Sequence, residues 1–147
     1  MGLAQTDHEI ATAPAWQLKS YAKKALARGD LYAAIDYYER YCQKRPDNLK
    51  VRNDLADLYR QSRDYRSARA TYQDIVQASP EKHALARFHL AQMHMQLADY
   101  DSAKVHFNKF LKAYKGGRDY RTYKKRVKAH LVGCDKAPSL LDSILKV

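Results

Sequence analysis

Three stretches of the sequence align with one another and decide the fold: GDLYAAIDYYERYCQKRP (29–46), RDYRSARATYQDIVQASP (63–80) and ADYDSAKVHFNKFLKAYK (98–115). In each stretch an alanine follows an aspartate by four residues, and an aromatic ring follows the alanine by four more. The aligned residues are Asp30, Asp64 and Asp99, then Ala34, Ala68 and Ala103, then Tyr38, Tyr72 and Phe107. The steps are 34 and 35 residues long. Such a period is typical of stacked helical hairpins, each too small to bury its apolar face alone.

Each repeat is expected to be two antiparallel helices, because an amphipathic run precedes every aligned stretch. The three runs cover residues 16–28, 49–62 and 84–97. The aspartate can cap the second helix by accepting the unpaired amide hydrogens of its first turn. The small alanine lets the paired helices approach closely, and the ring fills the space between successive units. Pro46 and Pro80 end the second helices of their repeats.

This pattern resembles the tetratricopeptide repeat, whose signature pairs a small residue with an aromatic one and ends in proline. The second repeat has the signature residues Leu55, Ala56, Tyr59, Tyr65, Ala68, Tyr72 and Pro80. Ala25, His94 and Lys115 depart from the signature in the other repeats. The resemblance implies an all-α fold, a right-handed superhelical solenoid of three helix pairs over residues 15–117. The expected repeats are 15–48, 49–82 and 84–117.

The segments outside the repeats are expected to cap them. Residues 118–134 should form a capping helix, because apolar residues at helical spacing alternate there with Lys and Arg, and a solenoid needs a cap with one polar side. A short tail helix or a linker is expected over 138–147. Residues 1–13 are expected to be loosely ordered.

The composition argues against several classes of function. Hydrophobic residues make up 46% and charged residues 29% of the 147 residues, as in a globular chain. No apolar run approaches the about 20 residues that cross a bilayer. Neither a glycine-rich phosphate loop, a G-x-S-x-G elbow nor an H-E-x-x-H motif occurs. We therefore expect a non-catalytic chain without a cofactor and without a membrane span.

Histidines and cysteines give no metal-site pattern. His89 and His94 are five residues apart, whereas two ligands on one helix face need a separation of three or four. His94 replaces a core tyrosine of the repeat, so packing explains it. Cys42 and Cys134 are too few for a four-cysteine zinc site, and we expect both to be unreactive packing residues. No metal is expected.

The positive charge is concentrated near the C-terminus. Lys and Arg number 27 against 16 Asp and Glu, a net charge of +11. Ten of these cations lie between Lys109 and Lys136, with only Asp119 and Asp135 against them. A solvated outer face and an electrostatic dock for an acidic protein segment both remain open. The candidate residues of this basic cap are Arg121, Lys124, Lys125 and Lys128.

The first helix of each pair is expected to line the concave face of the solenoid and to bind a partner there. The candidate residues are Lys19, Lys23, Lys50, Asn53, Arg60, Phe88, Gln92 and Met95. This face is cationic at one end and apolar at the other. It suits an extended peptide or a helix with an acidic part and a hydrophobic anchor.

One known use of tetratricopeptide repeats does not fit the sequence. Cochaperones of this family hold a C-terminal carboxylate with Lys and Asn side chains in the first two repeats and with Lys and Arg in the third. Lys19 matches this clamp, but Lys23 and Asp54 replace the asparagines, and Asp54 would repel a carboxylate. Leu85 and His89 replace the cations of the third repeat. The sequence therefore argues against binding of chaperone tails.

A finer resemblance concerns large Bacteroidota envelope proteins, in which an N-terminal repeat module precedes a PD40-type β-propeller and an OmpA-like domain. It rests on residues 59–65, 90–93 and 100–110 and on Gly133-Cys134, and it would cover residues 17–137. It implies a docking module of a periplasmic, outer-membrane-associated protein, in some cases part of type IX secretion. Peptidoglycan would be bound only by domains that this sequence does not contain.

The sequence thus predicts a scaffold for protein–protein interaction within a larger envelope component. The alternative is a cytoplasmic adaptor or an RNA-associated repeat protein that uses the basic cap, although nucleic acid is the less favoured partner.

Overall fold

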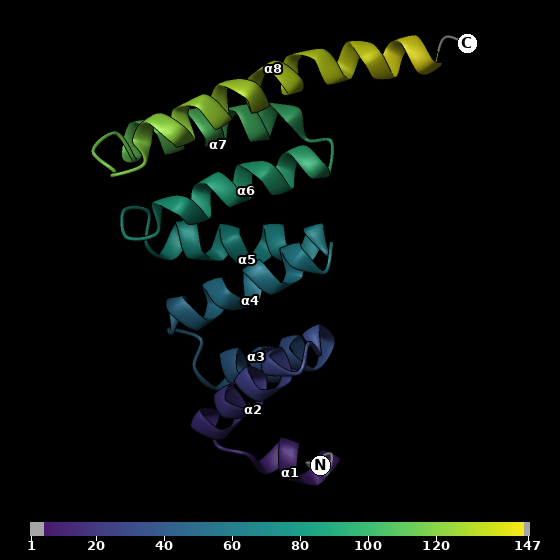
Figure 1. Cartoon of the computed structure of the whole chain (residues 1–147), viewed down its shortest axis with the longest axis vertical. Coiled ribbons are helices and arrows are strands. Elements are labelled where there is room, and N and C mark those ends of the chain that lie inside the picture. The colour runs from purple at the N-terminus through teal and green to yellow at the C-terminus, as the bar shows by residue number, and fades with distance from the viewer. Residues whose placement is uncertain (1–4, 146–147) are drawn as a thin grey trace. The chain divides into compact units, whose positions relative to one another are not determined.

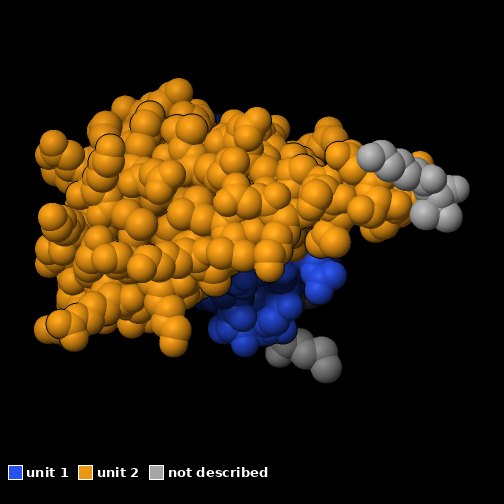
Figure 2. All heavy atoms as spheres, turned by 90° about the horizontal axis from the view of Figure 1, so that it is seen from above, with its two compact units in different colours: residues 1–64 blue, residues 65–147 orange. Residues whose placement is uncertain are grey.

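The computed structural model describes residues 5–145, and these residues form eight α-helices and no β-strand (Figure 1). The all-α fold is thereby confirmed. The helices are α1 (Asp7–Thr12), α2 (Ala15–Ala27), α3 (Leu31–Lys44), α4 (Leu49–Gln61), α5 (Tyr65–Ala78), α6 (Ala84–Gln96), α7 (Tyr100–Ala113) and α8 (Tyr120–Leu145). The chain divides into two compact units, residues 1–64 and 65–147 (Figure 2). The first unit contains α1 to α4 and the second α5 to α8.

The turns that follow α2, α4 and α6 share one backbone geometry. Gly29, Arg63 and Ala98 adopt positive φ angles of 78°, 65° and 61°. In each turn the next residue, an aspartate, donates its amide hydrogen to the carbonyl five residues back, at 2.9 Å. This is the hydrogen bond that closes a helix in the Schellman motif. The repeated aspartate thus lies directly after a helix end, where the next helix begins.

Capping by the repeated aspartate is confirmed at two turns. A carboxylate oxygen of Asp30 accepts the amide hydrogen of Ala33 at 3.0 Å. Asp99 accepts the amide hydrogen of Ser102 at 3.3 Å. Each bond satisfies one of the amide groups that a helix leaves unpaired in its first turn.

The repeated alanines and rings are buried, as the period predicts. Ala34, Ala68 and Ala103 are fully buried, as are Tyr72 and Phe107, and Tyr38 is 4% exposed. In the first unit α3 packs against both α2 and α4. In the second, successive helices pack against each other from α5 to α8. Small residues at these positions allow the helices to approach, and the rings fill the remaining volume.

The N-terminal segment is more regular than the sequence predicts. Residues 1–4 lie outside the described residues, but residues 7–12 form α1 in place of loose structure. Thr6 and Glu9 form a capping box: the Thr6 hydroxyl accepts the Glu9 amide hydrogen, and the Glu9 carboxylate accepts that of Thr6 at 2.9 Å. This T-x-x-E signal is visible in the sequence. Ile10 and Ala13 then pack against the core of the first unit.

One continuous helix, α8, replaces the expected capping helix and separate tail. It runs through Gly133 and Pro138, where we expected a break. Pro138 removes a backbone donor, yet the helix continues, and the hydroxyls of Ser139 and Ser143 donate to carbonyls of the preceding turn. The last part of α8 extends past α6 and α7 (Figure 1). Its apolar side chains are therefore exposed, with Ile144 at 69% and Leu145 at 82%.

Candidate functional site

The predicted binding residues of the first two repeats lie on α2 and α4. Lys23 and Lys50 are exposed, whereas Lys19, Asn53 and Arg60 are half-buried. The charges of all three lysines act on the carboxylate of Asp54. Burial raises the pKa of Asp54 most strongly, the charge of Asp57 raises it further, and the positive charges of Lys50, Lys19 and Lys23 partly offset both effects. The three lysines therefore lie close enough to Asp54 for their charges to affect it, and Lys23 lines a pocket with it.

A cavity of about 370 Å³ lies between these helices, and we call it the α2–α4 pocket. It is lined by Lys23, Leu26, Tyr38, Asp54, Asp57, Leu58 and Gln61. Asp57 is already engaged, because an Arg60 guanidinium nitrogen lies 3.5 Å from one of its oxygens and the Asn53 amide nitrogen 3.5 Å from the other. The pocket thus combines an exposed ammonium group, two carboxylates and apolar walls.

Among the predicted binding residues of the third repeat, the prediction is wrong for Phe88. Phe88 is fully buried, with the rings of Phe107, Phe110, Tyr123 and His130 around it at centroid distances of 5.1–6.0 Å. Tyr123 and His130 belong to α8. The apolar end of the predicted face is therefore covered by this helix.

Gln92 and Met95 also face α8. The Gln92 side chain lies 3.4 Å from the Nε2 atom of His130. The Cε atom of Met95 would lie 3.1 Å from a Cβ atom placed on Gly133, so α8 passes close to α6 at this glycine. The spacing of apolar residues predicts a buried face on α8 but does not indicate that this face covers α6. Gln92 and Met95 are half-buried beside α8, so a partner contact through either one stays a prediction.

The four residues of the predicted basic cap are all exposed on α8. The ammonium group of Lys124 lies 6.0 Å from the ring centroid of Tyr120. Arg126, in the same stretch, covers the rings of Phe88 and Tyr123 at 4.8 and 5.3 Å. Arg126 therefore has a packing role, whereas the charges of Arg121, Lys125 and Lys128 point to solvent.

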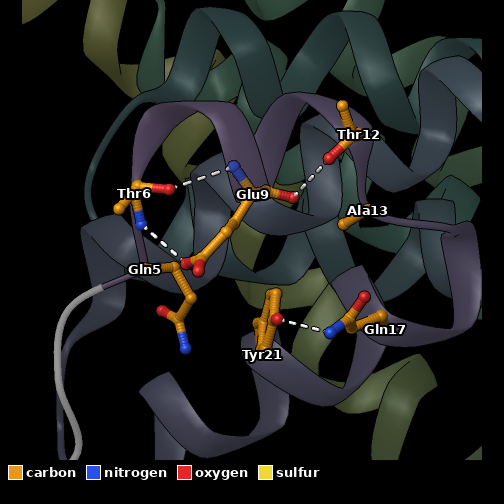
Figure 3. Close-up of a pocket in the computed structure, with 7 residues that line it drawn as sticks. All are labelled: Gln5, Thr6, Glu9, Thr12, Ala13, Gln17 and Tyr21. Carbon is orange, nitrogen blue, oxygen red and sulfur yellow. Dashed lines mark hydrogen bonds between the residues drawn. The ribbon is translucent and has the colours of Figure 1, made fainter.

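A cavity of about 660 Å³ lies beside α1, and the sequence does not predict it (Figure 3). It is lined by Gln5, Thr6, Glu9, Thr12, Ala13, Gln17 and Tyr21. Its polar groups mostly bond to each other or to the surrounding helices. Gln17 donates to the Tyr21 hydroxyl at 2.5 Å, and the Tyr37 hydroxyl donates to Gln5 at 2.8 Å. The bond from Tyr37 joins the segment before α1 to α3, and the bond between Gln17 and Tyr21 lies within α2, so we assign this cavity a structural role.

Two histidines of the second unit stack on each other. The rings of His94 and His106 are 5.2 Å apart and 13° from parallel, and the Nδ1 atom of His94 lies 3.1 Å from an Asp99 carboxylate oxygen. Burial lowers the pKa of His94 and lowers that of His106 to about 4, where His94, Arg87 and Lys109 add to the effect. Within the described residues no cluster of three or more His, Cys, Asp or Glu side chains could hold a metal ion.

Cys42 and Cys134 are both free thiols. Burial is the main reason why the pKa of each thiol is raised, so neither is a ready nucleophile at neutral pH. Of the helices described, none has the length and apolar character that crossing a bilayer requires.

Two models of the tetratricopeptide repeat family match the chain, one over residues 25–82 and the other over residues 85–116. These residues are tetratricopeptide repeats. The matches include the turns at Gly29, Arg63 and Ala98 and all three buried alanine and ring pairs.

Solved tetratricopeptide repeat domains share the fold. The Sgt2 domain from Aspergillus fumigatus is 23% identical, with a TM-score of 0.65 over 90% of this chain and 83% of that chain. The Yersinia enterocolitica type III secretion chaperone SycD, in complex with a peptide of the translocator YopD, is 15% identical, with a TM-score of 0.71 over 84% and 93%. The TPR2B domain of yeast Sti1, in complex with pHsp70, is 13% identical, with a TM-score of 0.67 over 84% and 97%. A comparison with curated proteins found no match.

Proposed function

We propose that this chain is a non-catalytic scaffold that binds a peptide segment of a partner protein through the α2–α4 pocket. The observation that carries the proposal is the set of polar side chains on α2 and α4 that the core does not need. They meet at a cavity large enough for a side chain, on a repeat fold whose solved neighbours include complexes with a YopD peptide and with pHsp70. Concave sites with a few convergent polar groups are typical of ligand binding.

The charges favour an acidic partner segment. Four cations act on the carboxylates of Asp54 and Asp57. Three are lysines whose charges affect Asp54, namely Lys19, Lys23 and Lys50, and the fourth is Arg60, which pairs with Asp57. The surplus of positive charge attracts the carboxylates of a partner, whereas the negative charge of Asp54 repels a partner carboxylate that comes too close. A segment with acidic residues that reach the lysines, and with an apolar residue between Leu26 and Leu58, satisfies both conditions.

The test is a selection of random peptides displayed on phage, followed by affinity measurement with a synthetic peptide of the enriched type. We expect enrichment of Asp and Glu together with an apolar residue. Lys23→Glu should raise the Kd at least about tenfold, because it replaces attraction by repulsion at the pocket. Lys24→Glu makes the same charge change on an exposed neighbour outside the pocket and should alter the Kd less than about twofold. Equal Kd values for the two variants would refute the assignment.

We further propose that the chain is the docking module of a larger periplasmic envelope or type IX secretion component, associated with the outer membrane. The support is the sequence resemblance over residues 17–137. The complete reading frame tests this proposal: a downstream β-propeller and an OmpA-like domain would support it, and a frame encoding a cytoplasmic adaptor would refute it.

The alternative is an RNA-associated adaptor, which the exposed cations of α8 favour. A fluorescent single-stranded RNA distinguishes the two functions, because binding through Arg121, Lys124, Lys125 and Lys128 would weaken steeply with salt and saturate at a defined stoichiometry. We expect weak RNA binding that does not saturate.

A further inference from the structure

The second unit has a cationic pocket that neither the repeat signature nor the proposed function uses. It has a volume of about 400 Å³ and lies where the loop after α5 meets the beginning of α6 and the end of α7. It is lined by Pro80, Glu81, Arg87, Lys109, Lys112 and Ala113. We call it the α6–α7 end pocket. Three of its six lining residues are cations, and Glu81 is the only acid among them.

The three cations have no partner in the described part of the chain. Neither Arg87, Lys109 nor Lys112 forms an ion pair or a side-chain hydrogen bond there. Arg87 and Lys109 both act on the half-buried ring of His106, and their charges lower the pKa of that ring. Their positive fields therefore overlap at this end of the hairpin, and Glu81 is the one carboxylate among the lining residues that can offset them.

Helix stability explains only part of this arrangement. Lys112 lies in the last turn of α7, where a cation interacts favourably with the helix dipole. Arg87 is the fourth residue of α6, where the dipole favours a carboxylate instead, and the first turn of α6 has no acidic residue. A helix-stabilising role therefore does not account for Arg87, whereas recognition of an anion does.

The positive surface continues beyond the pocket. The beginning of α6, the end of α7 and the beginning of α8 lie at the same end of the second unit (Figure 1). The turn between α7 and α8 adds Lys115 and Arg118, both exposed, and Asp119 is the only acid in that turn. An elongated anionic partner could therefore follow this edge.

We propose that the α6–α7 end pocket binds an acidic peptide segment in which an apolar side chain is flanked by carboxylates. The Pro80 ring, the Ala113 methyl group and the aliphatic stems of the two lysines offer apolar surface, and the charged ends form the rim. A bare phosphate or an RNA backbone would use the rim and leave the apolar surface uncovered. This site shares no residue with the α2–α4 pocket and goes beyond the proposed function.

The test uses the full chain carrying Lys23→Glu, so that the proposed contact in the first unit does not contribute. The probe is a fluorescein-labelled peptide with a central leucine and two glutamates on each side, followed by fluorescence anisotropy at low salt. Adding Lys109→Glu and Lys112→Glu should raise the Kd at least about tenfold. Arg87→Gln should raise it about three- to fivefold. These positions line an open pocket, and circular dichroism would check that each variant remains folded.

The matched control adds Lys44→Glu and Lys136→Glu, which change the net charge equally at exposed positions outside the pocket. This control should alter the Kd less than about twofold. If the variant with both Lys109→Glu and Lys112→Glu fails to fold, the Kd of Arg87→Gln alone tests the proposal. Equal weakening by the two double variants would overturn the proposal in favour of nonspecific attraction. Equally tight binding of a peptide with serine in place of the leucine, or displacement of the peptide by RNA, would also overturn it.

Discussion

Three turns of this chain use the same backbone conformation with three different residues. Gly29 adopts its positive φ without steric cost, but Arg63 and Ala98 carry a Cβ atom that crowds the backbone in this region. The hydrogen bonds that follow each turn, from Asp30, Asp64 and Asp99, hold the strained residues in place. The chain therefore tolerates strain at two turns to keep the hairpin geometry.

We predict that Ala98→Gly raises the free energy of unfolding by about 0.5–1 kcal/mol, because glycine adopts this conformation without the Cβ contact but gains entropy in the unfolded chain. Gly29→Ala should lower it by about 1 kcal/mol, since it introduces the same strain. Urea denaturation followed by circular dichroism measures both changes. Equal signs for the two substitutions would contradict the turn assignment.

The second prediction concerns the repeated ring. Tyr72 is fully buried, and its ring lies 5.5 Å from that of His89. Tyr72→Ala should cost on the order of 3–5 kcal/mol, because it leaves a cavity that rigid helices cannot close. Tyr32→Ala is the control, since Tyr32 is 75% exposed and should change stability by less than about 0.5 kcal/mol. A melting temperature of Tyr72→Ala equal to that of the parent chain would show that the repeat register is wrong.

Among the helices, α8 has the largest effect on the candidate site, because it covers the third repeat. Val127 is fully buried in this helix, whereas Val132 is 52% exposed on its other side. Val127→Asp should destabilise the second unit by at least about 3 kcal/mol, since it buries a carboxylate without a partner. Val132→Asp should change stability by about 0.5 kcal/mol or less. Thermal unfolding of the two variants checks this directly, and equal melting temperatures would mean that α8 does not cover α6.

The α6–α7 hairpin gives the second unit a specific pH dependence. Because the folded-state pKa values of His94 and His106 are lowered, the unfolded chain binds protons more readily. Stability is therefore complete above the unfolded pKa of about 6.5 and falls as the pH drops towards about 4, by an amount on the order of 1–3 kcal/mol. The negative charge of Asp99 opposes this loss of stability, because it favours protonated histidine in the folded chain. The positive charges of Arg69, Arg87 and Lys109 increase the loss.

Urea denaturation between pH 7.5 and pH 5 measures this effect. His106→Phe keeps a ring in the stack but cannot bind a proton, so it should reduce the pH dependence. His8→Phe is the control, because His8 is exposed on α1. A pH dependence that His106→Phe leaves unchanged would show that the stacked pair does not control acid stability.

For the whole molecule, the period of 34 and 35 residues was sufficient to predict the all-α repeat fold and the buried alanines and rings. The spacing of Tyr123 and Val127 likewise predicts a helix with a buried face, but helical spacing does not say which neighbours that face covers. The sequence therefore suggests a partner contact for Phe88, whose ring is instead covered by α8. The α6–α7 end pocket could not be predicted from the sequence, because Arg87 and Lys112 are 25 residues apart and come together only through the hairpin.

The central claim is that the chain recognises an acidic peptide through side chains on α2 and α4. Nitrogen-15 chemical-shift mapping tests it most directly, with the chain labelled and the selected peptide added in steps. We expect that the backbone amides of Lys19, Lys23, Lys50 and Asn53 shift in proportion to occupancy, and that Lys23→Glu abolishes these shifts. Shifts confined to Arg121, Lys124, Lys125 and Lys128, with α2 and α4 unchanged, would contradict it.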